Sequence, residues 1–341
     1  MNAKNNSTCW WGLVLACGIS SFSLTTQAGK PVKPPPGPGI EPGIVFYAQN
    51  GYVNVANSDG SGIRNLFPVV DWGEFPRPSD LPHSGGYWFL TVRNDGSDNA
   101  LEAISESGVE LRLTTGPTVD VAVANPISSQ RWLVGDNKVA FIGSVPALST
   151  PPSIVAGLYL MDIDWSSGIP VAAGAPRLID WTVTWFANGL SGGYQGCAFS
   201  PDGSTIYFSF QGALFKADVA TGTAVGPLAS NFSSPELTVD GSKLVGCYDG
   251  YPVQTVGTDG TELTAVVPAS GIPLSGPCDY GIFAFWSPTG QNIVFTRLVW
   301  LNKRLTSMSE QVTIVSATGT VLGTVGDKPQ FTTTLGWRPA R

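Results

Sequence analysis

Three acidic residues in predicted loops, Glu74, Asp180 and Asp279, are the first candidates for hydrolytic chemistry in this chain of 341 residues. Two carboxyl groups held about 5–10 Å apart can act as a general acid and a base or nucleophile. The spacing of the three residues in the sequence does not fix any two of them at that distance. Whether they converge therefore depends on the fold that positions them.

The segment 189–193, GLSGG, matches the pattern around the nucleophile of many serine hydrolases. That pattern works only where a strand turns sharply into a helix and a histidine follows later in the chain. Here the segment is a glycine-rich loop, and the only histidine, His83, precedes it. We interpret the match as chance, and we expect His83 to be an exposed loop residue.

Aspartates are frequent, but most precede glycine in predicted turns, where the carboxylate bonds its own backbone. These residues are Asp59, Asp95, Asp202, Asp240 and Asp259. The segment 94–99, NDGSDN, has oxygen ligands for calcium but lacks the spacing and the glutamate of an EF-hand loop. A single histidine cannot build a multi-histidine metal site. The sequence therefore predicts neither a metal site nor a cofactor.

The elements that must position any site are short strands separated by turns. The stretch Cys197–Thr223 shows this best, with a strand ending at Phe199, then strands Thr205–Phe210 and Ala213–Asp218, and a weaker fourth strand. Pro201-Asp202-Gly203 is typical of a tight turn. This pattern predicts a four-stranded antiparallel meander. Because a lone meander cannot bury both of its faces, we expect it to be one unit of a repeat.

Five partial copies of this unit occur elsewhere in the chain. They are Ile44–Leu66, Trp72–Leu113, Arg131–Ile179, Ser234–Pro268 and Phe283–Val325. Six closing turns can be counted, at Asp59-Gly60, Ser107-Gly108, Ser167-Gly168, Thr221-Gly222, Asp259-Gly260 and Thr318-Gly319. A period of roughly 50 residues fits a four-stranded propeller blade with its loops.

The first copy lacks its opening strand, and the segment Thr332–Pro339, TTTLGWRP, resembles that missing strand. Pairing of this segment with Ile44–Ala48 would complete one blade shared by both ends of the repeat region. Closure of this kind leaves only short, protected sheet edges. The sequence therefore predicts an all-β, six-bladed β-propeller in which a C-terminal strand closes the first blade.

The motifs Cys197–Phe208, CAFSPDGSTIYF, and Phe285–Phe295, FWSPTGQNIVF, resemble the repeat of TolB-like propellers, in which WSPDG precedes an apolar strand. The resemblance covers most of the chain after residue 43. The WD40 repeat is less similar, because its histidine is absent from the copies. TolB-like propellers are commonly protein-interaction modules of the bacterial envelope. The resemblance thus implies a periplasmic or secreted protein without enzymatic activity that binds a protein partner.

Loops that lead into the first strands of the blades are expected to line the mouth of the central channel. The candidates for binding are Tyr194, Gln195, Asp279 and Tyr280, together with the acids Glu74 and Asp180. The alternative hypothesis is a carbohydrate- or small-ester-active enzyme or a lectin, with exposed aromatic residues stacking on a glycan. Convergence of two of the acids would favour that alternative.

Three cysteines follow the predicted leader: Cys197, Cys247 and Cys278. In the expected propeller, Cys247 ends the second strand of one blade and Cys278 precedes the first strand of the next. These positions lie on one face of neighbouring blades, so a Cys247–Cys278 disulfide is a candidate in an oxidising compartment. The alternative is three reduced thiols.

Residues 1–28 have the pattern of a secretory signal peptide, with Thr26-Gln27-Ala28 before the cleavage point. A lipid anchor at Cys17 is the minor alternative. Residues 29–43 form a Pro/Gly-rich linker, and 44–341 form the propeller. The formal net charge of −7 disfavours nucleic acid as a partner. No membrane-spanning segment is expected after removal of the leader.

Overall fold

The stretch from Tyr194 to Ser230 forms one antiparallel sheet of four strands joined by short turns. Its strands are β13 (Tyr194–Phe199), β14 (Thr205–Phe210), β15 (Ala213–Asp218) and β16 (Ala224–Ser230), paired in that order. The turn between β13 and β14 contains Gly203 at φ 71°, a conformation that favours glycine. The predicted meander is confirmed, and the bounds of β14 and β15 are those expected from the sequence.

The structure is a computed structural model. It describes residues 39–69, 76–94, 99–114, 130–133, 135–146, 154–182, 194–248, 253–266, 283–300, 308–330 and 332–340. All of them belong to one compact unit, Gly37–Arg341. The predicted leader, its cleavage point and Cys17 lie outside the described residues, so they stay predictions. Within the described ranges, no helix has the length and apolar character needed to cross a membrane.

Five further sheets repeat the same arrangement, and we number the blades in chain order with the Tyr194–Ser230 sheet as blade 4. Blade 1 contains β25 (Thr332–Arg338), β1 (Ile44–Gln49), β2 (Tyr52–Asn57) and β3 (Arg64–Pro68). Blade 2 contains β4 (Arg77–Pro78), β5 (Trp88–Asn94), β6 (Asn99–Ser105) and β7 (Glu110–Arg112). Blade 3 contains β8 (Arg131–Trp132), β9 (Lys138–Pro146) and β10 (Ile154–Asp164), with β11 (Val171–Ala172) and β12 (Arg177–Leu178) both pairing with β10.

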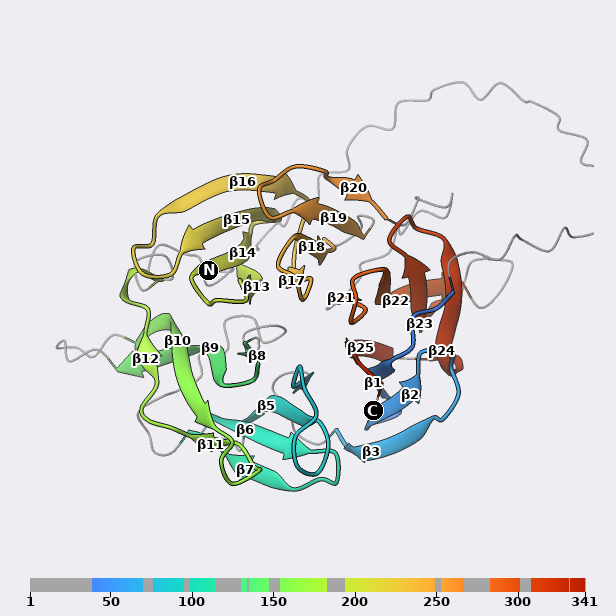
Figure 1. Ribbon diagram of the computed structural model, residues 1–341, viewed down its shortest axis with the longest axis horizontal. Coiled ribbons are helices and arrows are strands. Elements are labelled where there is room, and N and C mark those ends of the chain that lie inside the picture. The colour runs from blue at the N-terminus through green and yellow to red at the C-terminus, as the bar shows by residue number, and fades with distance from the viewer. Residues whose placement is uncertain are drawn as a thin grey trace, which may run out of the picture. The chain divides into compact units, whose positions relative to one another are not determined.

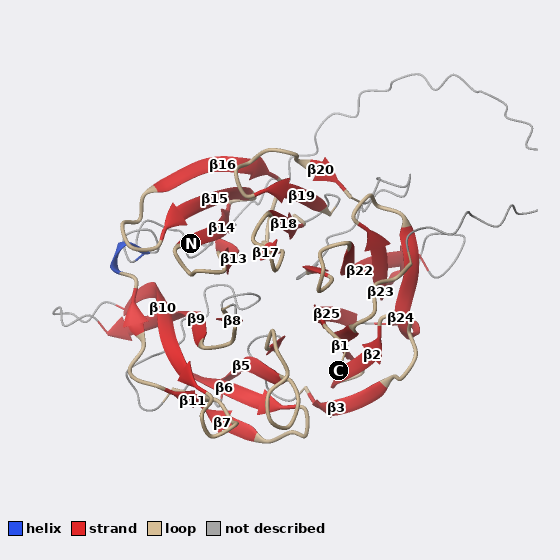
Figure 2. Cartoon of the chain, viewed as in Figure 1, coloured by secondary structure: helices blue, strands red, loops and turns tan. Residues whose placement is uncertain are grey.

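The last two sheets have four strands each. Blade 5 contains β17 (Glu236–Leu237), β18 (Lys243–Gly246), β19 (Gln254–Gly257) and β20 (Thr264–Ala265). Blade 6 contains β21 (Ala284–Trp286), β22 (Asn292–Trp300), β23 (Met308–Ser316) and β24 (Val321–Gln330). Figure 1 shows the six sheets standing around one axis in chain order. Besides strands and loops, the described residues contain a short helical turn at 180–182 (Figure 2).

The ring is closed by pairing between β25 and β1. In this antiparallel register Ile44 lies opposite Arg338 and Val45 opposite Trp337, and a bulge follows at Phe46. The prediction of a six-bladed propeller closed by a C-terminal strand is therefore confirmed. The six predicted closing turns are also confirmed, since each of their glycines has a positive φ between 70° and 89°.

Six clusters of buried apolar side chains hold the ring together, one at each interface between neighbouring blades. Strand β1 shows why its sequence is apolar throughout. Val45 and Tyr47 pack toward blade 6, whereas Phe46 and Ala48 pack toward blade 2. Successive side chains of a strand point to opposite faces, so a strand buried on both faces loses the usual alternation with polar residues.

The last residues of the predicted linker lie against the propeller. The carboxylate of Glu41 accepts hydrogen bonds from the backbone N–H and the hydroxyl of Thr289, at 2.7 and 2.8 Å. The Glu41 N–H donates to Asn292 Oδ1 at 2.8 Å, and Ile40 packs on the core between blades 6 and 1. The segment just before β1 is thus held against blade 6 and against the core that blade 6 shares with blade 1.

Substituting Trp337 tests the closure of the ring. Trp337 is fully buried in β25, so Trp337→Ala removes a large side chain from the interface of blades 6 and 1. We expect a loss of about 3–5 kcal/mol in the free energy of unfolding, measured by urea denaturation. Val321→Ala, at an exposed position on the outer strand β24, is the matched control and should change little. Equal effects of the two substitutions would contradict closure by β25.

Candidate functional site

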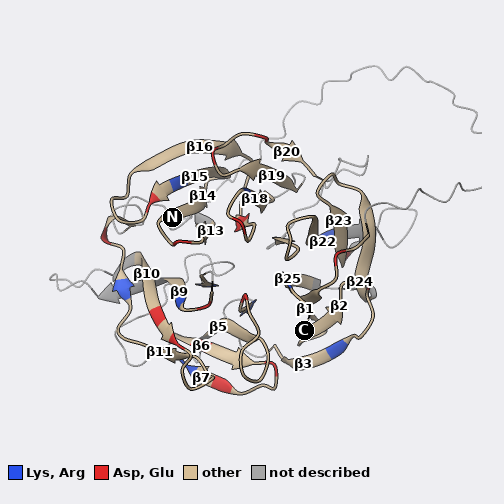
Figure 3. Cartoon of the chain, in the orientation of Figure 1, with Lys and Arg blue, Asp and Glu red and all other residues tan. Residues whose placement is uncertain are grey.

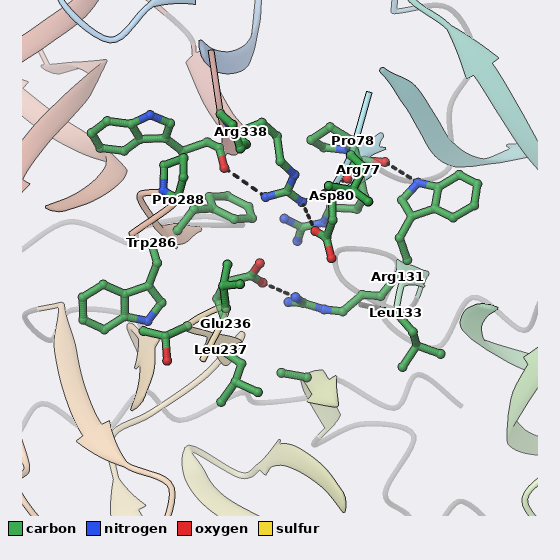
Figure 4. A pocket seen from close by; sticks show the side chains of 18 of the residues that line it. Arg77, Pro78, Asp80, Arg131, Leu133, Glu236, Leu237, Trp286, Pro288 and Arg338 are labelled. Carbon is green, nitrogen blue, oxygen red and sulfur yellow. Dashed lines mark hydrogen bonds and ion pairs between the residues drawn. The ribbon is translucent and has the colours of Figure 1, made fainter. Parts of the chain in front are cut away.

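A cavity of about 340 Å³ lies on the propeller axis, and every blade contributes to its wall. The lining residues belong to the innermost strands β25, β4, β8, β13, β17 and β21 or to the turns that follow them. Figure 4 shows their side chains converging from around the ring. The cavity is therefore the described part of the central channel.

The cavity opens at the end of the axis where the inner strands finish. Its rim includes Leu81, Gly135, Val239 and Pro288, all in turns that follow an inner strand. The sequence had favoured the opposite end, where loops lead into the inner strands. The cavity that the structure describes is thus reached from the face that carries the WSPDG-type turns.

Of the residues predicted to bind, only Asp180 has a described side chain, and it does not line this cavity. Asp180 is exposed in the helical turn after β12, an outer strand of blade 3. Tyr194 and Gln195 belong to β13, and only their backbone is described. Glu74, Asp279 and Tyr280 lie outside the described residues. Whether two of the three acids converge therefore stays open.

Two contacts cross the axis between blades that are not neighbours. The Arg131 guanidinium of blade 3 forms an ion pair with Glu236 of blade 5, and both side chains are mostly buried. The Arg77 guanidinium of blade 2 lies 4.2 Å from the ring centroid of Phe283 and 5.1 Å from that of Phe285, both in or beside β21 of blade 6. The channel therefore contains arginine side chains that join blades separated by one intervening blade.

A third arginine, Arg338, joins blade 1 to blade 2. Its Nε donates to the Ser79 carbonyl at 2.8 Å, and its Nη2 donates to the Pro78 carbonyl and lies 3.0 Å from Asp80 Oδ1. Burial raises the pKa of Asp80 to about 7, and the carboxylates of Asp136 and Glu236 act in the same direction against Arg338 and Arg131. Because 37% of the Asp80 side chain is exposed inside the cavity, water there screens part of this effect.

The rim of the cavity is apolar and exposed. The side chain of Leu81 is 49% exposed and that of Val239 is 68% exposed. Below the rim, Trp286 is buried, and its Nε1–H has no hydrogen-bond partner among the described residues. An exposed apolar rim around an interior of arginine and aromatic side chains is typical of a protein interface.

The turn aspartates have the structural role expected from the sequence. The carboxylate of Asp202 accepts hydrogen bonds from the Ser200 hydroxyl and from the backbone and side chain of Ser204, which lower its pKa to about 2. Asp59, Asp240 and Asp259 bond their own turns in the same way. In Figure 3 acidic residues lie in turns around the ring. The described residues contain no group of three or more metal-ligating side chains.

The expectation that His83 is an exposed loop residue is wrong. Its side chain is 17% exposed, and its Nε2 lies 2.9 Å from Oδ2 of the buried Asp136. Its ring stacks on Trp165 with centroids 3.5 Å apart and an interplanar angle of 4°. Pro82 and Gly85 around His83 suggested a free loop, but the neighbouring blade covers it.

Aromatic and cysteine residues of the strands lie in the core. Six aromatic residues of the blade strands are buried: Phe199, Tyr207, Phe208, Phe285, Trp286 and Trp337. Cys197 and Cys247 are buried as well. Cys278 lies outside the described residues, so the Cys247–Cys278 disulfide stays a prediction.

Sequence reasoning missed the arginines and Glu236 that line the channel. A signal for them was present, because Arg77, Arg131, Ala198 and Glu236 lie two residues before the turn in four of the inner strands. A charged residue at a position that is small or apolar in other copies marks a side chain directed toward the axis. Comparing the six inner strands position by position would have singled out these residues.

The chain was compared with protein-family models, curated proteins and solved structures. No protein-family model matches the sequence, and no curated protein matches it either. The solved structure of TolB from Acinetobacter baumannii is similar with a TM-score of 0.57 and 15% identity, over 89% of this chain and 68% of that one. The values for a putative TolB from Agrobacterium tumefaciens are 0.49 and 13%, over 86% of this chain and 99% of that one. For an oligogalacturonate lyase from Vibrio parahaemolyticus they are 0.43 and 12%, over 81% and 70%.

The chain thus folds as a six-bladed β-propeller that is structurally similar to the TolB of Acinetobacter baumannii. The structural resemblance that the repeat motifs predicted is therefore confirmed for the fold. One propeller fold carries many different functions, so the function of this chain must be argued from its own site.

A double-mutant cycle tests the ion pair across the axis. We expect Arg131→Met and Glu236→Leu each to lower the free energy of unfolding by about 3 kcal/mol, since each leaves the other charge buried. The double variant should be less destabilised than either single one, because no charge is then stranded. Additive losses in urea denaturation would contradict the contact. Lys138→Met, which breaks an exposed pair with Asp162, should change little.

The raised pKa of Asp80 predicts a pH-dependent effect of Asp80→Asn. Between about pH 4 and pH 7 the unfolded chain ionises this carboxyl group while the folded protein keeps it protonated, which favours the unfolded state as pH rises. Asparagine does not ionise, so it makes no such pH-dependent contribution, and its side-chain oxygen can still accept a hydrogen bond from Arg338. The difference in Tm, variant minus wild type, should therefore become more positive from pH 4 to pH 8. Asp202→Asn is the control: its parent pKa is lowered to about 2, so its linkage lies below about pH 4 and its difference in Tm should stay nearly constant over the same range.

Proposed function

We propose that this protein is an exported, non-enzymatic propeller that binds another protein at the mouth of its central channel. The observation that carries the proposal is the exposed apolar rim, with Leu81 and Val239, around the arginine- and aromatic-lined cavity. Exposed apolar side chains beside arginine and tryptophan are the usual anchors of protein interfaces.

The size and chemistry of the mouth fit one projecting segment of a partner. A cavity of about 340 Å³ has the volume of a few amino-acid side chains, within the range of small binding pockets. The exposed apolar rim residues Leu81 and Val239 come from blades 2 and 5, so a partner seated on both would cover the axis. The resemblance to TolB-like propellers supports a role in the bacterial envelope, because such propellers are commonly protein-interaction modules there.

Export is supported by the leader pattern of residues 1–28 and the proline-rich segment that follows. The protein would then act in the periplasm or outside the cell. The alternative of a carbohydrate- or ester-active enzyme, or of a lectin, depends on Glu74, Asp180 and Asp279. The two carboxyl groups of the described cavity wall, Asp80 and Glu236, each lie in an ion pair with an arginine.

Charged substitutions on the rim test the proposal. The purified protein is immobilised, and proteins captured from a native envelope extract and from culture fluid are identified by mass spectrometry. Leu81→Asp and Val239→Asp should each lower the amount of the specific partner about tenfold or more, because an apolar anchor is replaced by a charge.

Val225→Asp is the matched control, since Val225 is equally exposed but lies on the outer strand β16. The amount of partner that Val225→Asp captures should equal that of the wild type. The Tm of all three variants should also equal that of the wild type. A partner retained equally by the rim variants and the control would contradict binding at the mouth.

A further inference from the structure

The rim of the cavity in blade 2 is held by a residue of blade 3. Asp136 lies in the turn between β8 and β9 and is completely buried. Its Oδ1 accepts the backbone N–H of Asp80 at 2.7 Å, and its Oδ2 accepts that of Leu81 at 2.9 Å and lies 2.9 Å from His83 Nε2. One carboxylate therefore binds three groups of the rim segment, residues 79–86, across a blade interface.

Asp136 occupies a position that is glycine in equivalent turns. Its N–H donates to the carbonyl three residues earlier, as do those of Gly203 and Gly241 in blades 4 and 5. Those glycines have φ of 71° and 74°, and Asp136 has φ of 58°. A left-handed conformation is strained for residues other than glycine. A strained aspartate where the repeat uses glycine indicates that its side chain is needed.

His83 and Trp165 complete the contact. The Trp165 Nε1–H donates to the Asp136 carbonyl at 2.7 Å, and the same indole ring stacks on the His83 imidazole. Trp88 donates from Nε1 to the Ser84 carbonyl at 3.1 Å. Blade 3 thus contacts the rim segment through a hydrogen-bonded carboxylate and a stacked ring.

The held segment carries two residues of the mouth. Asp80 reaches Arg338 of blade 1 at 3.0 Å, and Leu81 forms part of the exposed apolar rim. Their backbone N–H groups are the ones that Asp136 accepts. The position of the rim in blade 2 therefore depends on a side chain that does not itself line the cavity.

We propose that Asp136, supported by His83, is a positioning residue of the channel mouth: it fixes Asp80 and Leu81 where a partner protein meets them. This inference rests on the proposed function for its binding consequence. Its structural part, the restraint of the rim segment by Asp136, stands on the contacts above.

Hydrogen exchange of the purified protein tests the restraint without any partner. Asp136→Gly keeps the turn, because glycine suits the left-handed conformation, and removes the carboxylate. We expect the amides of Asp80 and Leu81 to exchange about tenfold or more faster, as loss of a charged hydrogen-bond acceptor implies. Asp202→Asn, in the corresponding turn of blade 4, should leave these amides unchanged. Unchanged exchange in Asp136→Gly would overturn the inference.

Conservative variants separate the two parts of the contact. His83→Gln retains a donor toward Asp136 but loses the stacked ring, whereas His83→Phe retains stacking and loses the donor. If the hydrogen bond to Asp136 positions the rim, His83→Gln keeps slow exchange at Leu81 and His83→Phe does not. Slow exchange in His83→Phe would overturn the supporting role of the His83–Asp136 hydrogen bond, because the carboxylate still accepts the N–H groups of Asp80 and Leu81 in that variant.

The binding consequence is measured on the partner whose capture Leu81→Asp abolishes. Asp136→Gly should lower the amount of that protein about fivefold or more, and Asp202→Asn should not. Faster exchange with unchanged capture would overturn the positioning role while leaving the proposed function intact. If the wild type captures no such protein, the proposed function fails, and the exchange experiment still decides whether Asp136 restrains the rim.

Discussion

Pairing between β25 and β1 is the interaction on which the remaining structure depends. Each blade buries both faces against its neighbours, and the cores on the two sides of blade 1 contain residues of both β25 and β1. The register that sets Val45 opposite Trp337 completes blade 1 and thereby its contacts with blades 6 and 2. The central cavity exists only because six inner strands are held around one axis, and the Arg338 contacts to blade 2 depend on the same strand.

The chemistry of the channel follows from this closed geometry. Arg131 meets Glu236 and Arg77 meets Phe283 across the axis, although an intervening blade separates the strands that carry them. Ion pairs and cation–π contacts of this kind are strong only when water is excluded. The same ring leaves apolar side chains exposed at one end, where the turns after the inner strands form a rim. The proposed binding role rests on this combination of a buried polar interior and an exposed apolar rim.

Much of the fold could be predicted from the sequence because turn chemistry is local. Pro201-Asp202-Gly203 and Gln211-Gly212 delimit β14 and β15 to the residue, and the closing glycines count the blades. The site was less predictable because its residues meet only through the ring. Nothing near Arg131 in the chain indicates Glu236, and the stacking of His83 on Trp165 joins two blades. Asp136 was visible as a departure from the repeat, since Val-Gly-Asp replaces Pro-Asp-Gly there, but its partners were not.

The closure of blade 1 also has a consequence for the order in which the chain acquires structure. Residue 44 obtains its inner neighbour only from residues near 338, far later in the chain. Until that strand pairs, β1 has an unprotected edge, which other chains can extend. Contacts so distant in sequence form slowly. Slow closure therefore leaves the inner edge of blade 1 open to intermolecular pairing during folding.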